Sequence, residues 1–176
     1  MRTFRFFSLG VLAAVILLAL GGYMLPGTYH VKQSILVEAK QASVFNILNS
    51  FEYWEDWALD LHDLPNANTS ISGTEEGPGA IFTWNYDASN GRMEIVESKP
   101  DSLIRLNVQM QDNSLFSEVR FTLLPTESGV LVTWEESGDL GMNPLTRWYA
   151  MLAQFDKRLS ENYQAALQKL KMLCEK

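Results

Sequence analysis

Six short apolar runs separated by turn signals occupy the middle of the chain, and this pattern limits the fold more than any other feature. The turn signals include the tripeptides at 77–79 and 127–129 and the pair Asn90 and Gly91. An Asn-Gly pair favours a tight hairpin because both residues tolerate positive φ. Strands that follow one another this closely usually pair in sequence order, which predicts an antiparallel meander. The predicted strands cover 69–72, 80–86, 92–98, 103–110, 117–124 and 130–136.

The segment before the meander predicts one more strand and two short helices. Residues 29–38 alternate with period two and place Val31, Ile35 and Val37 on one face, which is typical of a half-buried strand. Residues 44–48 and 51–57 then carry apolar side chains at helical spacing. We therefore expect two short helices after the first strand, the second of which ends at 64–66.

The end of the chain predicts one long helix. Asn143 suits the N-cap, and Pro144 suits the first helical position. Apolar residues then recur at every third or fourth position, which indicates one continuous apolar face. A helix of about 30 residues is about 45 Å long and can cover a whole sheet. The residues of this stripe are Leu145, Trp148, Leu152, Phe155, Leu159, Tyr163, Ala166, Leu170 and Leu173.

The N-terminal residues predict a membrane anchor. Residues 6–25 carry no charge, and an apolar helix of about 20 residues crosses a bilayer core of about 30 Å. Arg2 and Arg5 precede this run, so the positive-inside rule places the N-terminus in the cytoplasm and the domain on the periplasmic or extracellular side. A signal peptide cleaved near 19–21, which would release a secreted protein, is the alternative. We expect an anchor or signal segment over 1–27 and one domain over 28–176.

Charge and metal-ligand content exclude several classes of function. The formal net charge is −7, and an acidic surface repels nucleic-acid phosphates, so no nucleic-acid partner is expected. The single cysteine, Cys174, can form neither an internal disulfide nor a four-thiolate metal site. The two histidines, His30 and His62, form no metal-ligand motif. No metal and no cofactor are therefore expected.

Four short motifs carry a resemblance to a known superfamily. They are Val37-x-Ala39 with Val44-Phe45, Phe51-x-x-Trp54-x-x-Trp57, Gly77-x-Gly79-Ala80-x-x-x-Trp84 with Gly91-x-x-x-Ile95, and Gly129-x-x-Val132-x-Trp134. Together they resemble the polyketide cyclase/dehydrase-like branch of the START-like (SRPBCC, Bet v 1-like) superfamily over roughly 29–175. One departure lies at the second helix, where relatives often carry Trp-Ser-Pro-Trp and this chain carries Trp57-Ala58-Leu59-Asp60.

The resemblance implies an α+β helix-grip fold. A curved antiparallel sheet of about seven strands would grip the long C-terminal helix, with two short helices after the first strand and an apolar cavity between sheet and helix. Members of the superfamily bind lipids, sterols, hormones or polyketides, or act as cyclases. The implied partner is a small apolar or amphipathic molecule.

Bulky apolar residues are the candidate ligand contacts, because ligand sites are mostly apolar with a few placed polar groups. Ordinary core packing is the alternative interpretation of the same residues. The candidates are Trp54, Trp57, Trp84, Phe121, Trp134, Trp148, Leu152 and Phe155. No catalytic residue is assigned. A titratable side chain directed into the cavity would favour catalysis, and the groups to inspect are Glu94, Arg105, Glu118, Glu136 and His62.

Three functions remain open at this point. The first is a membrane-tethered, non-enzymatic module that holds a lipid or polyketide-like ligand between the sheet and the C-terminal helix. The second is a cyclase or dehydratase that acts on a polyketide-like substrate, which requires a titratable group in the cavity. The third is an envelope protein with a closed core that binds a protein partner. The first leads, because the sequence contains no recognisable catalytic constellation.

Overall fold

A seven-stranded antiparallel sheet forms the body of the protein in the computed structural model, which describes residues 2–58, 68–86, 89–110 and 115–176. The strand order is β1-β7-β6-β5-β4-β3-β2, so the six strands of the meander pair in sequence order and β1 joins the last of them. This confirms the predicted sheet. Its strands are β1 (Thr28–Val37), β2 (Asn68–Gly73), β3 (Ala80–Tyr86), β4 (Ser89–Lys99), β5 (Leu103–Met110), β6 (Phe116–Thr126) and β7 (Gly129–Asp139).

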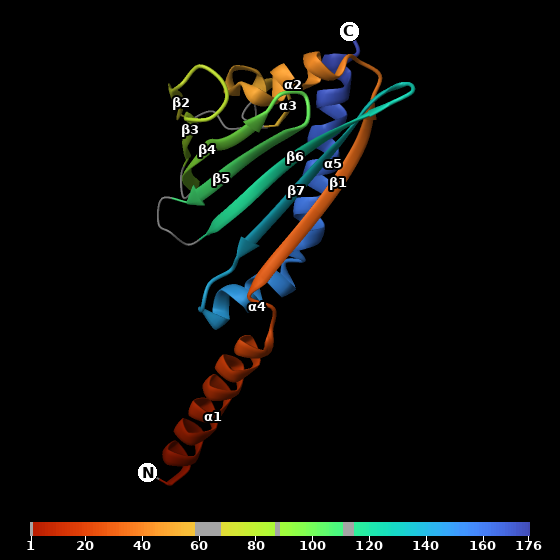
Figure 1. Cartoon of the computed structure of the whole chain (residues 1–176). Coiled ribbons are helices and arrows are strands. Elements are labelled where there is room, and N and C mark those ends of the chain that lie inside the picture. Colours follow the sequence, from red (N-terminus) through yellow and green to blue (C-terminus); the bar gives the residue numbers. More distant parts are fainter. Residues whose placement is uncertain (1, 59–67, 87–88, 111–114) are drawn as a thin grey trace.

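Helices cover one face and one end of this curved sheet, which confirms the helix-grip arrangement (Figure 1). The long helix α5 (Phe155–Cys174) packs along β1. Three short helical pieces, α2 (Gln41–Asn49), η1 (Phe51–Tyr53) and α3 (Trp54–Trp57), follow β1 as predicted. The predicted end of the second helix at 64–66 lies outside the described residues.

The C-terminal helical segment is broken near its start, and the prediction of one continuous helix is wrong at this point. Helix α4 (Pro144–Leu152) is separate from α5, and Gln154 between them adopts the left-handed conformation with φ of 51°. Asn143 caps α4 as predicted, because its side chain accepts a hydrogen bond from the Leu145 N–H. The break arises because the two halves of the apolar stripe have different partners. Helix α5 packs on the sheet, whereas α4 packs on the N-terminal helix.

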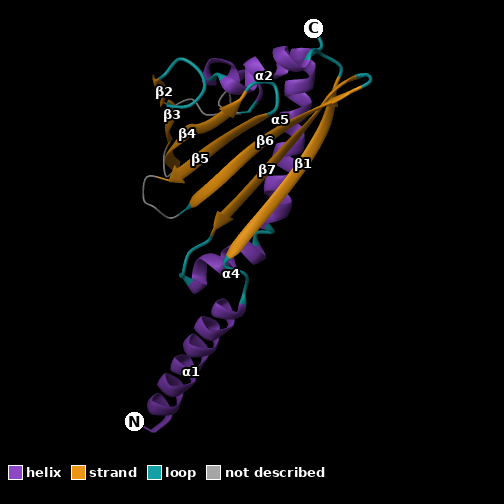
Figure 2. Ribbon diagram, viewed as in Figure 1, coloured by secondary structure: helices purple, strands orange, loops and turns teal. Residues whose placement is uncertain are grey.

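The N-terminal helix α1 (Arg2–Met24) extends away from the sheet (Figure 2). It packs against α4, which lies between α1 and the sheet. Its segment Phe6–Met24 has a mean hydropathy of 2.2 and is long and apolar enough to cross a membrane, a test that signal sequences also pass. Its apolar side chains are exposed along most of its length.

Candidate functional site

A buried carboxylate, Glu136, lies between the sheet and α5. In the paired register, Glu136 of β7 stands between Val31 of β1 and Val119 of β6. Its side chain faces the core, as its alternation with Val132 and Trp134 predicts, and the residue is only 7% exposed. Among the titratable candidates from the sequence, Glu136 is thus the one that the described structure buries.

Two tyrosines from different elements hold this carboxylate. The Tyr29 hydroxyl on β1 donates to Glu136 Oε1 at 2.6 Å, and the Tyr163 hydroxyl on α5 donates to Oε2. Such charge-assisted bonds offset part of the cost of burying a carboxylate. Burial and then the negative charge of Glu136 raise the pKa of both phenols far above the ordinary value, so both retain their protons at neutral pH.

Gly138 makes the reach of Tyr29 possible. It is paired with Tyr29 in the register between β1 and β7, two residues after Glu136. A Cβ at this position would lie 2.4 Å from a ring carbon of Tyr29, which is closer than packed atoms approach. The absence of a side chain therefore lets the tyrosine ring lie across β7 and place its hydroxyl beside Glu136.

An aromatic cluster continues from the carboxylate toward α3. The ring of Trp134 stacks on Tyr163 at 4.0 Å between centroids and lies 4.9 Å from Phe121 and 5.7 Å from Trp57. Trp54 completes the cluster at 5.9 Å from Phe121. All five side chains are 7% exposed or less. These rings lie between the sheet and the helices, in the region where the sequence predicted a cavity.

Two hydrogen-bond donors in this cluster lack acceptors. The indole N–H groups of Trp57 and Trp134 are buried and have no hydrogen-bond partner within the described part of the chain. The indole N–H of Trp54, in contrast, donates to the Leu48 carbonyl at 3.1 Å. Buried donors are almost always satisfied in folded proteins, so two unpaired donors in one cluster require an explanation.

Two open pockets lie at opposite ends of this cluster. Phe155 packs edge-on against Tyr29 at 5.0 Å and lines a pocket of 320 Å³. We call this the junction pocket, because it lies where α1, α4 and α5 meet; its wall includes Leu25, Leu140, Arg147 and Met151. At the other end, a pocket of 530 Å³ opens beside Trp84 and is also lined by Thr69, Arg92 and Met110.

The structure separates the eight predicted contact residues into three groups, which lie in the buried cluster, beside the two pockets and on α4. Trp54, Trp57, Phe121 and Trp134 form the buried cluster, and Trp84 and Phe155 line the two end pockets. The placement of Trp148 and Leu152 against the sheet is wrong, because α4 turns toward α1. The Trp148 indole N–H donates to the Leu18 carbonyl at 2.8 Å, and Leu152 is 74% exposed. Whether any of the eight residues contacts a ligand remains a prediction.

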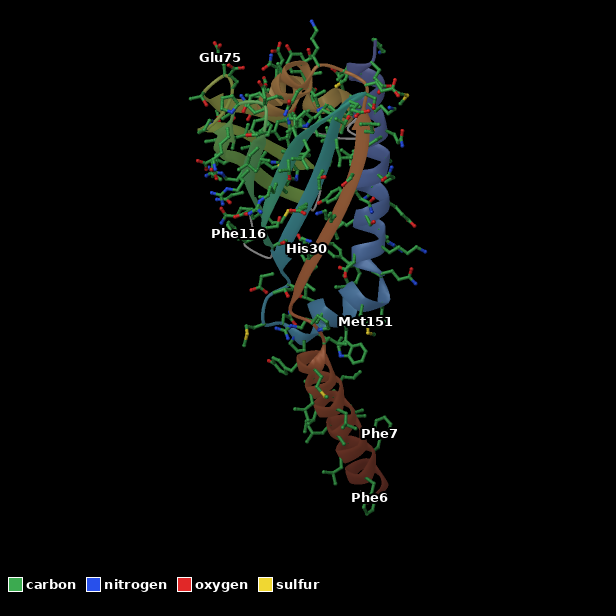
Figure 3. All side chains as sticks on the ribbon, turned by 45° about the vertical axis from the view of Figure 1, so that its right-hand side comes forward. Phe6, Phe7, His30, Glu75, Phe116 and Met151 are labelled. Atoms are coloured by element: carbon green, nitrogen blue, oxygen red, sulfur yellow. The ribbon has the colours of Figure 1, made fainter. Side chains whose placement is uncertain are left out.

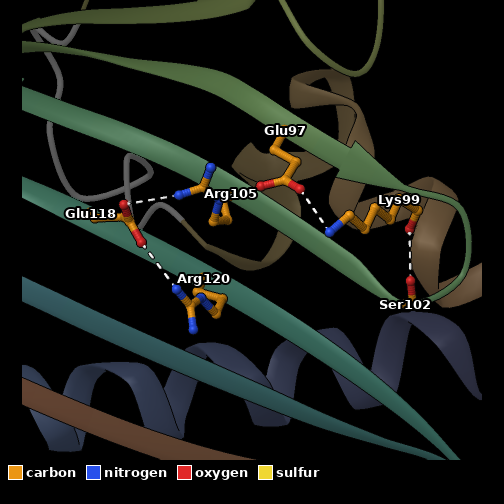
Figure 4. Close-up of polar contacts among 6 residues, drawn as sticks. All are labelled: Glu97, Lys99, Ser102, Arg105, Glu118 and Arg120. Carbon is orange, nitrogen blue, oxygen red and sulfur yellow. Dashed lines mark hydrogen bonds and ion pairs between the residues drawn. The ribbon is translucent and has the colours of Figure 1, made fainter.

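Of the remaining titratable candidates, Arg105 and Glu118 lie on the outer face of the sheet (Figure 4). Arg105 contacts Glu97 at 2.5 Å and Glu118 at 3.2 Å, and Glu118 also contacts Arg120. Hydrogen bonds from Lys99 and Arg105 lower the pKa of Glu97, as expected for a carboxylate with cationic partners. Glu94 pairs with Arg92 on the same face, and His62 lies outside the described residues.

The sequence did not indicate the two tyrosines that donate hydrogen bonds to Glu136, namely Tyr29 and Tyr163. Tyr163 belongs to the apolar stripe of α5, and a tyrosine there needs a partner for its hydroxyl. That requirement was the available signal. Tyr29 gave no comparable signal, because it lies 107 residues away from Glu136 in sequence.

Comparisons with known proteins identify a family and a shared fold. A family model described as polyketide cyclase/dehydrase and lipid transport matches residues 28–175. No curated protein matches the chain. Many solved structures share the fold, among them the following three at low identity.

Protein CV1439 from Chromobacterium violaceum has a TM-score of 0.61 and 14% identity, with 86% of this chain and 99% of that chain covered. Norcoclaurine synthase from Thalictrum flavum has a TM-score of 0.59 and 14% identity, with 83% and 92% covered. The di-domain ARO/CYC StfQ from the steffimycin biosynthetic pathway has a TM-score of 0.60 and 15% identity, with 84% and 51% covered. Since the family model spans most of the sequence, the chain belongs to the polyketide cyclase/dehydrase and lipid transport family.

Proposed function

We propose that residues 28–176 form a binding module for a small amphipathic molecule such as a lipid or a polyketide-like compound. The apolar part of the ligand lies against the aromatic cluster, and an oxygen of the ligand accepts hydrogen bonds from Trp57 and Trp134. The observation that carries this proposal is the pair of buried indole donors without acceptors. A family that includes lipid transport supports the same class of ligand.

The energetic argument rests on those donors. A buried N–H that loses its partner costs about 1–3 kcal/mol. A carbonyl, ester or hydroxyl oxygen bound nearby would remove this cost, while a pure hydrocarbon would not. The ligand therefore carries at least one oxygen acceptor beside its apolar body. To reach the donors, the ligand must displace rings of the packed cluster.

We further propose that α1 remains attached and holds the module beside a membrane, with the N-terminus in the cytoplasm. The length and hydropathy of Phe6–Met24 support a membrane span. The hydrogen bond from Trp148 to the Leu18 carbonyl supports retention, since cleavage of α1 would remove a built contact of the folded domain.

The binding proposal is tested on the full-length protein, purified from its own host in mild detergent and analysed by native mass spectrometry. We expect a bound small molecule that leaves on denaturation. Two neutral hydrogen bonds together contribute about 1–3 kcal/mol. The double variant Trp57→Phe with Trp134→Phe should therefore weaken binding of the identified molecule by about 5- to 150-fold.

Tyr53→Phe is the matched control, because it alters an exposed aromatic ring near the same helices. It should bind like the wild type. A protein that is persistently free of small molecules, or a double variant that binds as well as the wild type, would contradict the proposal.

A cyclase or dehydratase is the second candidate, and the Glu136 constellation favours it. A carboxylate can remove a proton next to a carbonyl group, and a phenol can stabilise the resulting oxyanion by hydrogen bonding. Both catalytic roles, the base and the oxyanion donor, require a substrate that reaches Glu136. The oxygens of Glu136 accept hydrogen bonds from Tyr29 and Tyr163 in this structure. Ring closure of a poly-β-keto thioester with loss of water is the reaction to assay.

In that assay, Glu136→Gln is expected to slow turnover about 100-fold or more, which is typical for the loss of a general base. Glu118→Gln on the outer face is the matched control and should leave the rate unchanged. Absence of turnover by the wild type, or equal rates for Glu136→Gln and wild type, argues against the enzymatic candidate.

A further inference from the structure

Helix α4 carries an exposed apolar face that the fold does not cover. Leu145, Tyr149 and Leu152 follow one another at i, i+4 and i+7 and are 68%, 70% and 74% exposed. Met142 lies just before the helix and is 77% exposed. We call these four residues the α4 apolar face. A contiguous apolar surface on one helix usually marks a contact with another protein or with a membrane.

The position of α4 along α1 identifies the contact. Trp148 donates to the Leu18 carbonyl, six residues before the end of the apolar span at Met24. At about 1.5 Å per residue, this contact lies about 9 Å inside the end of the span. Pro144 packs directly on Gly22, where a Cβ would lie only 2.5 Å from the proline side chain. Helix α4 is thus docked beside the last turns of α1, not beyond them.

The charges of the segment fit a lipid environment. No acidic residue lies between Asp139 and Asp156, although the chain as a whole carries a net charge of −7. The one basic residue there, Arg147, donates to the carbonyls of Leu25 and Gly141 and approaches that of Tyr23. Arg147 therefore satisfies carbonyls at the C-terminal end of α1, which a bilayer leaves without partners.

We propose that the α4 apolar face inserts into the leaflet distal to the N-terminus and forms a second membrane contact beside α1. This inference rests on the proposed membrane span of α1. Amphipathic helices lie in the membrane–water interface with their apolar face towards the acyl chains, and Trp, Tyr and Arg are favoured in this interface. The junction pocket then opens at the bilayer surface. Met151, which lines this pocket, lies between the sheet and α1 (Figure 3).

Spin-label accessibility in phospholipid vesicles tests this inference with the full-length chain. Cys174→Ser removes the native thiol, and single labels are attached through Val15→Cys, Leu145→Cys, Leu152→Cys or Gln168→Cys. All four positions are exposed, so the labels do not disturb the core. Gln168 lies in the second half of α5, away from the junction pocket, and is the matched control outside the bilayer. Collision with oxygen reports lipid, and collision with a water-soluble nickel chelate reports water.

We expect the labels at Val15, Leu145 and Leu152 to collide mainly with oxygen and the label at Gln168 to collide mainly with nickel. If Val15 reports lipid while Leu145 and Leu152 report water or immobilisation by a second copy, the inference is overturned and the span of α1 stands. If Val15 also reports water, the membrane tether itself fails, and the inference fails with it.

Discussion

Replacement of Phe121 by alanine is expected to lower the free energy of unfolding by about 3–5 kcal/mol. The side chain is fully buried and contacts the rings of Trp54, Trp57 and Trp134. Removal of the ring leaves a cavity bounded by three large rings that cannot easily collapse into it. Since small domains have a total stability of about 5–15 kcal/mol, the loss is a large part of the total.

Urea titration of the full-length protein in detergent, followed by tryptophan fluorescence, measures this change. Phe116→Ala is the matched control, because Phe116 starts the same strand but is 54% exposed. The control should change the free energy of unfolding by no more than about 0.5 kcal/mol. Equal losses for the two variants would show that the aromatic cluster does not form the core of the domain.

Alkaline pH is expected to destabilise the protein through Tyr29 and Tyr163. Burial and the charge of Glu136 raise the pKa of both phenols above the ordinary value of about 10. Above that pH the unfolded chain loses these protons while the folded protein keeps them. The stability is therefore complete below about pH 10 and falls as the pH rises further, by up to about 1.4 kcal/mol per pH unit for each tyrosine.

The free energy of unfolding measured at pH 8, 10 and 11.5 tests this result. Tyr163→Phe removes one of the two titrating groups and should roughly halve the alkaline slope, although it also weakens the protein at pH 8. Tyr53→Phe, which alters an exposed phenol, is the matched control and should keep the wild-type slope. A wild-type slope in Tyr163→Phe would mean that this phenol does not titrate differently in the two states.

The sheet was predictable because its signals are local. Period-two alternation and turn residues such as Asn90 and Gly91 lie within each hairpin, so the sequence is enough to locate the strands. The same alternation placed Glu136 on the face of Trp134. The partners of Glu136 were not predictable, because the contact with Tyr29 depends on the pairing of β1 with β7, which no local pattern encodes.

The break at Gln154 shows the limit of periodicity. Apolar spacing shows which side of a helix is buried, but it does not show which element that side packs against. The stripe from Trp148 to Phe155 keeps helical spacing although its partner changes from α1 to the sheet. A residue other than glycine that adopts the left-handed conformation, such as Gln154, has no recognisable sequence signal. The direction in which the side chains of Trp148 and Leu152 point could therefore be learned only from the structure.

The short connections between α1 and the sheet limit how far the domain can move away from α1. Only Leu25, Pro26 and Gly27 separate α1 from β1, and at about 3.5 Å per residue they span about 10 Å at most. The chain returns to α1 through α4 and leaves it again at Gln154, and the Leu140 N–H bonds to the Gly27 carbonyl at 2.8 Å. If α1 spans a membrane as proposed, a domain held by three such passages cannot swing across an aqueous gap to an opposing bilayer. Any ligand that the proposed binding module exchanged with a second membrane would then have to be brought to it, or taken from it, by a mobile carrier.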